Sequence, residues 1–292
     1  MSDIILLDGG MGQELVQRSG DRPTPLWSTQ VMIDHPGLVA AVHADYAAAG
    51  ASIHTTNTYA ILRDRLEGTA LEDKFEALYA AALKECAGAG ALAGSMGPLR
   101  ASYRPDLMPA HDVAVATYAE VADLLAPKVD LILCETVASI AHARAALEAA
   151  EATGKPVWLA MTVDDTDGTK LRSGEPLADV FAVAGAANAI LANCSSPEAI
   201  SAAMAVLATG DKPFGGYANG FTKITDGFLG DKPTVDALTA RKDLGPDAYA
   251  RFVMGWIAEG ATIVGGCCEV GPAHIAKLAQ DITAAGHRIV SP

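Results

Sequence analysis

The sequence has few of the features that mark exported, membrane-spanning or nucleic-acid-binding proteins. It contains five cysteines in 292 residues, too few for a disulfide framework. No apolar run approaches the roughly 18–20 residues of a membrane span. Residues 1–8 lack the basic segment and the long apolar stretch of a signal peptide. We therefore expect a cytoplasmic protein with reduced thiols and no membrane partner.

Basic residues are also scarce, because 35 acidic residues face 21 Lys and Arg and the formal net charge is -14. Such a balance disfavours nucleic acid or an anionic membrane as a partner. It is compatible with a cationic small substrate, although surface acidity commonly serves solubility alone. The seven histidines show no metal-ligand spacing. The expected partners are therefore small molecules.

Short apolar runs alternate with alanine-rich segments of helical character along the whole chain. The runs are continuous, as expected of parallel strands covered on both faces. The predicted strands are 4–10, 52–59, 91–98, 130–136, 156–163, 187–194, 213–220 and 261–268. The predicted helices are 36–49, 71–87, 111–126, 139–153, 176–185, 197–208, 246–259 and 272–285.

Eight strand–helix units in a chain of this length predict an α/β fold, a single (β/α)8 TIM barrel formed by one domain, residues 1–292. A doubly wound sheet is the alternative, but it would normally need fewer strands or a second domain. Barrel enzymes place their chemistry at the carboxyl ends of the strands. Polar residues gather there in every unit, and the loops 164–175 and 221–245 follow strands too. One of these loops could act as a lid, or both could be solvated surface.

Two adjacent cysteines, Cys267 and Cys268, end the last predicted strand. Neighbouring side chains on a strand point to opposite faces, so both sulfurs reach one point only if the backbone bends. We expect Gly265 and Gly266 to permit that bend through unusual backbone angles. Cys194 ends another strand. Three thiolates converging at strand ends would hold a soft metal such as Zn²⁺ and leave a fourth position open for a substrate.

The chain resembles the homocysteine S-methyltransferase family. The motifs that carry the resemblance run in the family's order from residue 8 to 268. They are Asp8-Gly-Gly-Met-Gly-Gln-Glu-Leu15, Pro25-Leu-Trp-Ser28, Ala49-Gly-Ala51, Thr56-Asn-Thr-Tyr59, Gly94-Ser-Met-Gly-Pro98, Glu135-Thr136, Asn193-Cys194 and Gly265-Gly-Cys-Cys268.

The resemblance implies a zinc site formed by Cys194, Cys267 and Cys268. It implies that Asp8 and Glu135 bind the amino group of homocysteine, and that Trp27 and Tyr59 lie on the methyl-donor side. The same motifs place four more residues in the expected substrate site, Gly9, Gly10, Thr136 and Asn193. The chain departs from the family at Leu191-Ala192 and at Glu269 and Val270, where Gly or Arg and then Thr are usual.

The reaction implied is zinc-dependent methyl transfer from an onium donor, with S-methylmethionine favoured, to the thiol of homocysteine, giving methionine. Betaine, a methylfolate acting with a cobalamin partner, a selenol or another thiol remain alternatives, as does a non-catalytic thiol-binding zinc protein. An all-sulfur ligand set disfavours a zinc hydrolase.

Several of these side chains also have purely structural interpretations. Asp8 and Glu135 could be a helix cap or a loop ion pair, and Trp27 and Tyr59 could be core aromatics. Cys86 and Cys134 are expected to be inert buried thiols.

Overall fold

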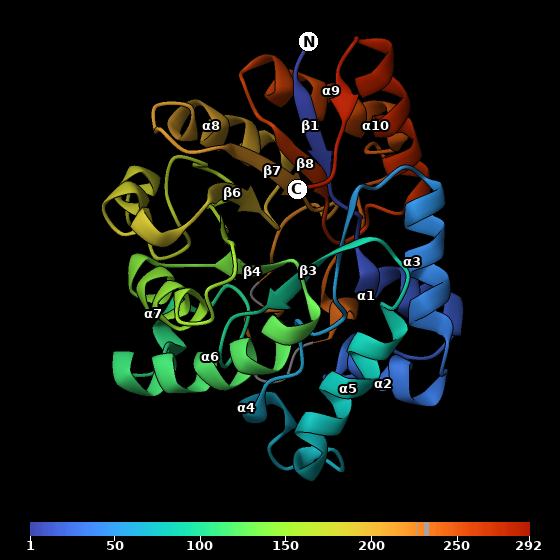
Figure 1. Ribbon diagram of the computed structural model, residues 1–292, viewed down its shortest axis with the longest axis vertical. Coiled ribbons are helices and arrows are strands. Elements are labelled where there is room, and N and C mark those ends of the chain that lie inside the picture. The colour runs from blue at the N-terminus through green and yellow to red at the C-terminus, as the bar shows by residue number, and fades with distance from the viewer. Residues whose placement is uncertain (226, 231–233) are drawn as a thin grey trace.

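The computed structural model describes residues 1–225, 227–230 and 234–292 and has an α/β, TIM-barrel-like fold (Figure 1). Each of the eight predicted strand segments overlaps a strand, and a ninth strand follows near the C-terminus. The strands of the described residues are β1 (Asp3–Leu6), β2 (Ile53–Thr55), β3 (Ala91–Met96), β4 (Leu131–Val137), β5 (Val157–Met161), β6 (Ala189–Asn193), β7 (Phe214–Ala218), β8 (Ile263–Gly266) and β9 (Arg288–Ile289).

Neighbouring strands pair in parallel in the order β2-β3-β4-β5-β6-β7-β8-β1-β9. The segments of β1 and β2, which are not neighbours in this order, also meet. Leu7 and Ile53 form a parallel bridge, and the backbone N–H of Ser52 donates to the carbonyl of Leu6 at 2.7 Å. β9 pairs with β1 on the side opposite β8. The sequence did not predict β9, because two residues are too short for a periodic signal.

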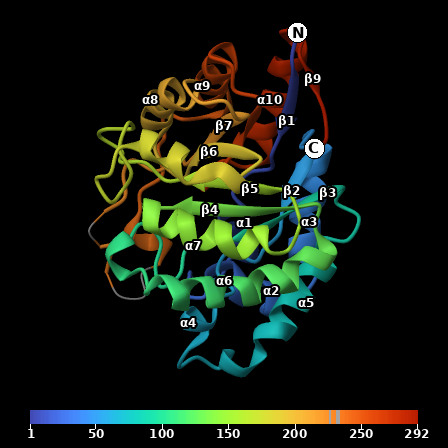
Figure 2. The same cartoon turned by 60° about the vertical axis from the view of Figure 1, so that its left-hand side comes forward.

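Helices surround the strands, with α6 and α7 on one side of the sheet and α8, α9 and α10 on another (Figures 1 and 2). None of the described helices is long and apolar enough to cross a membrane. The α-helices of the described residues are α1 (Met11–Ser19), α2 (Trp27–Asp34), α3 (Leu38–Ala48), α4 (Arg63–Leu66), α5 (Phe75–Glu85), α6 (His111–Leu125), α7 (Ile140–Glu151), α8 (Pro197–Leu207), α9 (Pro246–Ala258) and α10 (Pro272–Ala284).

The helices differ from the sequence prediction in three stretches. The helix expected over 176–185 is instead a pair of 3₁₀ segments, Leu177–Ala182 and Ala184–Ala186. Val180, Phe181 and Val183 lose side-chain freedom in an α-helix, and Gly185 weakens it further. The helices α1 and α2 were not predicted, since they lie within one long connection after β1. The four-residue helix α4 was not predicted either.

The buried side chains form two clusters, one between strands and helices and one inside the barrel. Along β4, Leu131 and Leu133 belong to the inner cluster, whereas Ile132 and Cys134 face the helices. Because side chains alternate along a strand, the next inward position is Glu135. The same alternation leads from Ala93 to Ser95 on β3. The last inward-facing positions of β3 and β4 are therefore polar, and they lie at the carboxyl end of the inner core.

Candidate active site

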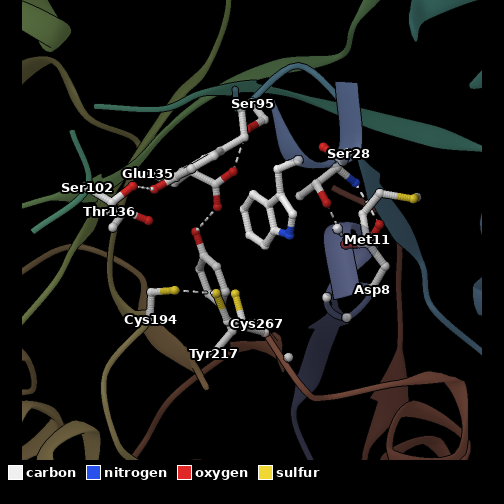
Figure 3. A pocket seen from close by; sticks show the side chains of 18 of the residues that line it. Asp8, Met11, Ser28, Ser95, Ser102, Glu135, Thr136, Cys194, Tyr217 and Cys267 are labelled. Atoms are coloured by element: carbon white, nitrogen blue, oxygen red, sulfur yellow. Dashed lines mark hydrogen bonds between the residues drawn. The ribbon is translucent and has the colours of Figure 1, made fainter. Parts of the chain in front are cut away.

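A cavity lies at the carboxyl ends of the strands and contains the predicted site (Figure 3). Its walls come from β-strand ends and from the connections that follow them. The lining residues that matter below are Asp8, Gly9, Gly10, Trp27, Tyr59, Ser95, Ser102, Tyr103, Glu135, Thr136, Cys194, Tyr217, Phe228, Cys267 and Cys268.

The structure brings Cys194, Cys267 and Cys268 together although they come from two strand ends. Their sulfur atoms all lie within 4.8 Å of one another, and none of the three is in a disulfide. The Sγ atoms of Cys194 and Cys267 are 2.7 Å apart and face each other across the pocket floor (Figure 3). Three free, convergent sulfurs with a pocket above them fit a soft metal ion that keeps one position open.

Gly265 and Gly266 serve this site differently from the expectation. Neither has a positive φ, so unusual backbone angles are not their contribution. A Cβ on Gly265 would lie 2.5 Å from the Cβ of Leu7, and one on Gly266 would lie 2.1 Å from a methyl of Val270. The glycines therefore let β8 pack closely against β1 and the loop beyond it.

Protons are shared unequally within the three-cysteine cluster. Hydrogen bonds from Cys267 and Cys268 lower the pKa of Cys194 well below its ordinary value. Hydrogen bonding to Cys194 raises the pKa of both Cys267 and Cys268 well above it. The protein alone thus favours one thiolate, and full deprotonation requires a bound cation to offset the repulsion.

Asp8 is buried in the wall of the pocket that the cysteines also line, and it forms no ion pair with a Lys or Arg of the described residues. The backbone N–H and the hydroxyl of Thr55 donate to its two carboxyl oxygens at 2.9 and 2.8 Å. His43 and His54 lie close by, but burial lowers their pKa values to about 3 and about 4, so both are neutral. Burial raises the pKa of Asp8 to about 8. A cation entering the pocket would therefore be strongly favoured by this carboxyl.

Glu135 faces the same space from the end of β4. Ser95 donates a hydrogen bond to one carboxyl oxygen, and the Tyr217 hydroxyl donates to the other at 3.0 Å (Figure 3). Burial raises the pKa of Glu135 to about 7 despite these bonds. Asp8 and Glu135 also repel each other when ionised. The pair is thus suited to an ammonium group, whose charge would stabilise both carboxylates.

The aromatic wall of the pocket is held by polar contacts at its rim. The rings of Trp27 and Tyr59 meet edge to face with centroids 6.3 Å apart. The Tyr59 hydroxyl bonds to the Ser102 hydroxyl at 2.7 Å. The Trp27 indole N–H donates to Gln13, whose amide N–H donates to Glu269 at 2.5 Å. The unusual carboxylate beside the cysteine pair therefore anchors the indole.

The remaining predicted residues divide into those that line the pocket and one that supports it. Gly9 and Gly10 line it, and each allows close backbone contact, since their Cβ atoms would lie 2.0 and 2.7 Å from carbonyl oxygens. Thr136 lines the pocket as well. Asn193 does not line it, but its side chain bonds to the backbone N–H and the hydroxyl of Thr136 at 3.0 and 3.1 Å.

Tyr103 is a site residue that the sequence analysis missed. Its hydroxyl donates to the Cys194 sulfur at 3.1 Å, and its ring lies 5.9 Å from that of Phe228. The guanidinium of Arg172, from the connection after β5, lies 5.2 Å from the centre of the same ring. Tyr103 sits in an irregular connection after β3, where no periodicity predicts direction.

Backbone strain is concentrated at this end of the barrel. Among the described residues, six that are not glycine have a positive φ, a conformation that costs energy and tends to mark functional sites. Four of them line the pocket, Glu269 follows the lining residue Cys268, and Arg100 lines a neighbouring cavity. They are Trp27, Arg100, Tyr103, Thr136, Cys194 and Glu269.

Both irregular loops contribute to the face that carries the pocket. Residues 164–175 supply Arg172, and residues 221–245 supply Phe221, Phe228 and Leu238 to the pocket wall. Four positions of the second loop, 226 and 231–233, lie outside the described residues. A lid role for either loop stays a prediction.

The other two cysteines lie away from the pocket. Cys86 and Cys134 are fully buried, and burial raises the pKa of each thiol to about 12. Such thiols stay protonated and unreactive near neutral pH.

A TIM-barrel-like fold with three converging sulfurs beside two protonatable carboxyls is typical of a metal-dependent enzyme. The sequence model of the family described as homocysteine S-methyltransferase matches residues 5–282. The chain belongs to the homocysteine S-methyltransferase family.

One bacterial and one plant relative illustrate the match. Homocysteine S-methyltransferase of Escherichia coli strain K12 is 31% identical over 305 residues, covering 94% of each chain. Selenocysteine Se-methyltransferase of Brassica oleracea var. italica is 24% identical, covering 94% of this chain and 87% of its own. The metallated crystal structure of the homocysteine methyltransferase MmuM from Escherichia coli superposes with a TM-score of 0.80 and 27% identity, covering 96% of both chains.

Proposed function

We propose that this protein transfers a methyl group from a sulfonium donor, with S-methylmethionine favoured, to the thiol of homocysteine. The carbon–sulfur bond of the donor breaks as the methyl carbon bonds to the acceptor sulfur. The donor leaves as a neutral thioether, the thiol proton is released, and both products are methionine. The observation that carries the proposal is the convergence of the three cysteine sulfurs with Asp8 and Glu135 in one pocket.

The three sulfurs fit Zn²⁺ by number and softness, and they converge within 4.8 Å of one another. Zinc, when bound by Cys194, Cys267 and Cys268, supplies the positive charge that lets a substrate thiol act as a thiolate near neutral pH. The Tyr103 hydroxyl donates to Cys194 and fixes the direction of that sulfur.

Asp8 and Glu135 are proposed to bind the ammonium group of the acceptor. Both carboxyls are buried, and each keeps a raised pKa until a cation arrives. The acceptor's amino group would hold them ionised and would fix its carbon chain between them. Thr136, braced by Asn193, and the close backbone at Gly9 and Gly10 shape the wall on which the acceptor rests.

Trp27 and Tyr59 are proposed to face the donor. Aromatic faces attract sulfonium and quaternary ammonium groups and let them leave once neutral. Catalysis would then depend mainly on alignment of the donor's methyl carbon with the acceptor sulfur. A betaine donor fits the same wall, and a selenol acceptor fits the same metal site, as the name of the Brassica relative illustrates.

We also propose that residues 1–292 form one domain, a complete (β/α)8 barrel, and that the protein acts in the cytoplasm. The bridge between Leu7 and Ile53 supports closure between β1 and β2. The short β9 would then be an addition outside the eight-stranded cycle.

The test is metal content of protein purified under reducing conditions, followed by a methyl-transfer assay. We expect about one zinc per chain and methionine formed from S-methylmethionine and homocysteine. Zinc without turnover would retain the site but overturn the choice of substrates, and would favour a thiol-binding protein. Protein that neither retains nor takes up zinc would overturn the site.

A further inference from the structure

A second, larger cavity lies against the outer side of the pocket. The inner pocket has a volume of about 90 Å³ and the outer chamber about 700 Å³. The two share three wall residues, Trp27, Ser102 and Phe228. At the roughly 30 Å³ that each molecule occupies in the liquid, a volume of 90 Å³ corresponds to about three waters, which is too little for two amino acids side by side. A second substrate must therefore extend into the outer chamber.

The outer chamber is basic although the protein as a whole is acidic. Its described lining contains three arginines, Arg65, Arg100 and Arg104, against the single carboxylate of Asp64. The formal net charge of the chain is -14. A local excess of positive charge on such a protein favours an anionic group in this chamber.

Two of these arginines already have partners within the protein. Arg104 makes a two-pronged contact with Asp106, at 2.8 and 2.6 Å, and donates to the Leu229 carbonyl. Arg100 lies 3.9 Å from Asp64, and half of its side chain is exposed. The charge of Arg104 is thus paired with a carboxylate, and the charge of Arg100 is partly exposed to solvent.

Arg65 differs, because no carboxylate of the described residues pairs with it. Its Nη2 donates to the Pro98 carbonyl at 2.9 Å, and its Nε is buried without an acceptor in the described part of the chain. A half-buried guanidinium without a counter-ion is costly, and a carboxylate is its preferred partner. An arriving carboxylate would therefore find a cation that is already fixed in place.

Arg65 lies between the outer chamber and Tyr59, one of the two aromatic residues proposed to face the donor. Its guanidinium carbon lies 5.4 Å from the centre of the Tyr59 ring, and its Nη2 lies 3.5 Å from the Ser102 hydroxyl. Tyr59 lines the inner pocket, and Ser102 lines both cavities. A molecule with a cationic centre against Tyr59 and an anionic group a few atoms away would match this arrangement.

We propose that the outer chamber binds the carboxylate-bearing tail of the methyl donor and that Arg65 is the partner of this carboxylate. The inference rests on the proposed function. It makes Arg65 a determinant of donor specificity: sulfonium donors with a carboxylate are preferred over those without one.

The test compares S-methylmethionine with its carboxyl methyl ester, which keeps the sulfonium and the amino group. In the wild-type protein we expect the ester to have a KM at least about tenfold higher, because a charged hydrogen bond is lost. Arg65→Gln should raise the KM for S-methylmethionine by a similar factor, with the ester and homocysteine almost unchanged. Arg63→Gln is the matched control on α4, since Arg63 pairs with Glu76 and Glu120 outside the chamber and should leave both donors unaffected.

Each outcome separates the inference from the proposed function. Equal KM values for the acid and the ester in the wild-type protein would overturn the inference, whether or not Arg65→Gln folds. An equal effect of Arg65→Gln on both donors would also overturn it, while methyl transfer itself would still stand. A wild-type protein that uses no sulfonium would overturn the proposed function.

Discussion

Strand ends and connecting loops meet in one pocket but hold their side chains in different ways. Glu135 and Tyr217 continue the inward-facing register of β4 and β7, and they bond to each other at 3.0 Å. Trp27 and Tyr103 come from connections and have positive φ angles of 48° and 62°. Their polar groups depend on single contacts, to Gln13 and Cys194. The side proposed for the acceptor is thus held by the sheet, whereas Trp27 and Tyr103 are held by a few contacts of the connecting segments.

The largest effect should come from removing one thiol from the cluster of Cys194, Cys267 and Cys268 at the strand ends. Cys267→Ser is expected to abolish metal retention and to lower methyl transfer by at least about 1,000-fold, because the metal ligand set loses a thiolate. Cys134→Ser is the matched control, a buried strand cysteine that faces the helices. Metal analysis and initial rates measure both, and full activity in Cys267→Ser would refute the ligand assignment.

A smaller effect is expected from neutralising a carboxyl group that is proposed to bind the acceptor. Asp8→Asn should raise the KM for homocysteine by about 100-fold, since one buried charge loses its partner. The donor's KM should change little. 4-Sulfanylbutanoate, which lacks the amino group, is the control acceptor, and the variant should use it as well as the wild type does. A variant that still discriminates fully between the two acceptors would show that Asp8 does not bind the ammonium group.

The raised pKa values of Asp8 and Glu135 predict a pH dependence of stability. In the folded protein these carboxyls titrate near about 8 and about 7, and in the unfolded chain near about 4. Between these values the folded state holds extra protons, so the free energy of unfolding contributed by the pair falls as pH rises from about 4 to about 8.

Thermal unfolding of metal-free protein between pH 5 and pH 8 measures this dependence. The double variant Asp8→Asn, Glu135→Gln should lose less stability over that range than the wild type. Parallel curves for the two proteins would contradict the raised pKa values.

The smallest effect should come from weakening the hydrogen bonds that hold the Trp27 side chain in place. Glu269→Gln weakens the contact that orients Gln13 and, through it, the Trp27 indole. We expect the donor's KM to rise by roughly threefold, in line with the loss of one partly exposed hydrogen bond, while the KM for homocysteine is unchanged. Ser19→Ala, on the α1 helix that carries Gln13, is the control. A change confined to homocysteine would place Glu269 on the acceptor side instead.

The contrast between the two sides also explains how much the sequence could predict. The ends of the predicted strands located Asp8, Tyr59, Glu135 and the three cysteines, and the family resemblance pointed to Trp27 and to the role expected of each residue. Neither signal predicts Tyr103, which lies in an irregular connection, or Arg65, which lies in the four-residue helix α4, because both segments are too short for a periodic pattern to indicate where their side chains point. The geometric role of Gly265 and Gly266 was misjudged for a similar reason: the sequence shows a glycine but not what lies 2–3 Å from its missing side chain.

The short β9 strand has a consequence for how the chain reaches its final form. β1 is held between β8 and β9, and Arg288 pairs with Asp3 at 2.7 Å. Because β1 precedes β8 and β9 in the chain, the edge that pairs with β8 has no partner until residues 263–289 have left the ribosome, and only the contacts with residues 52–53 can form earlier. Synthesis at about 5–20 residues per second leaves that edge unpaired for on the order of ten to sixty seconds. During this time the nascent chain exposes an apolar strand, and β1 becomes the segment that a chaperone would most usefully cover.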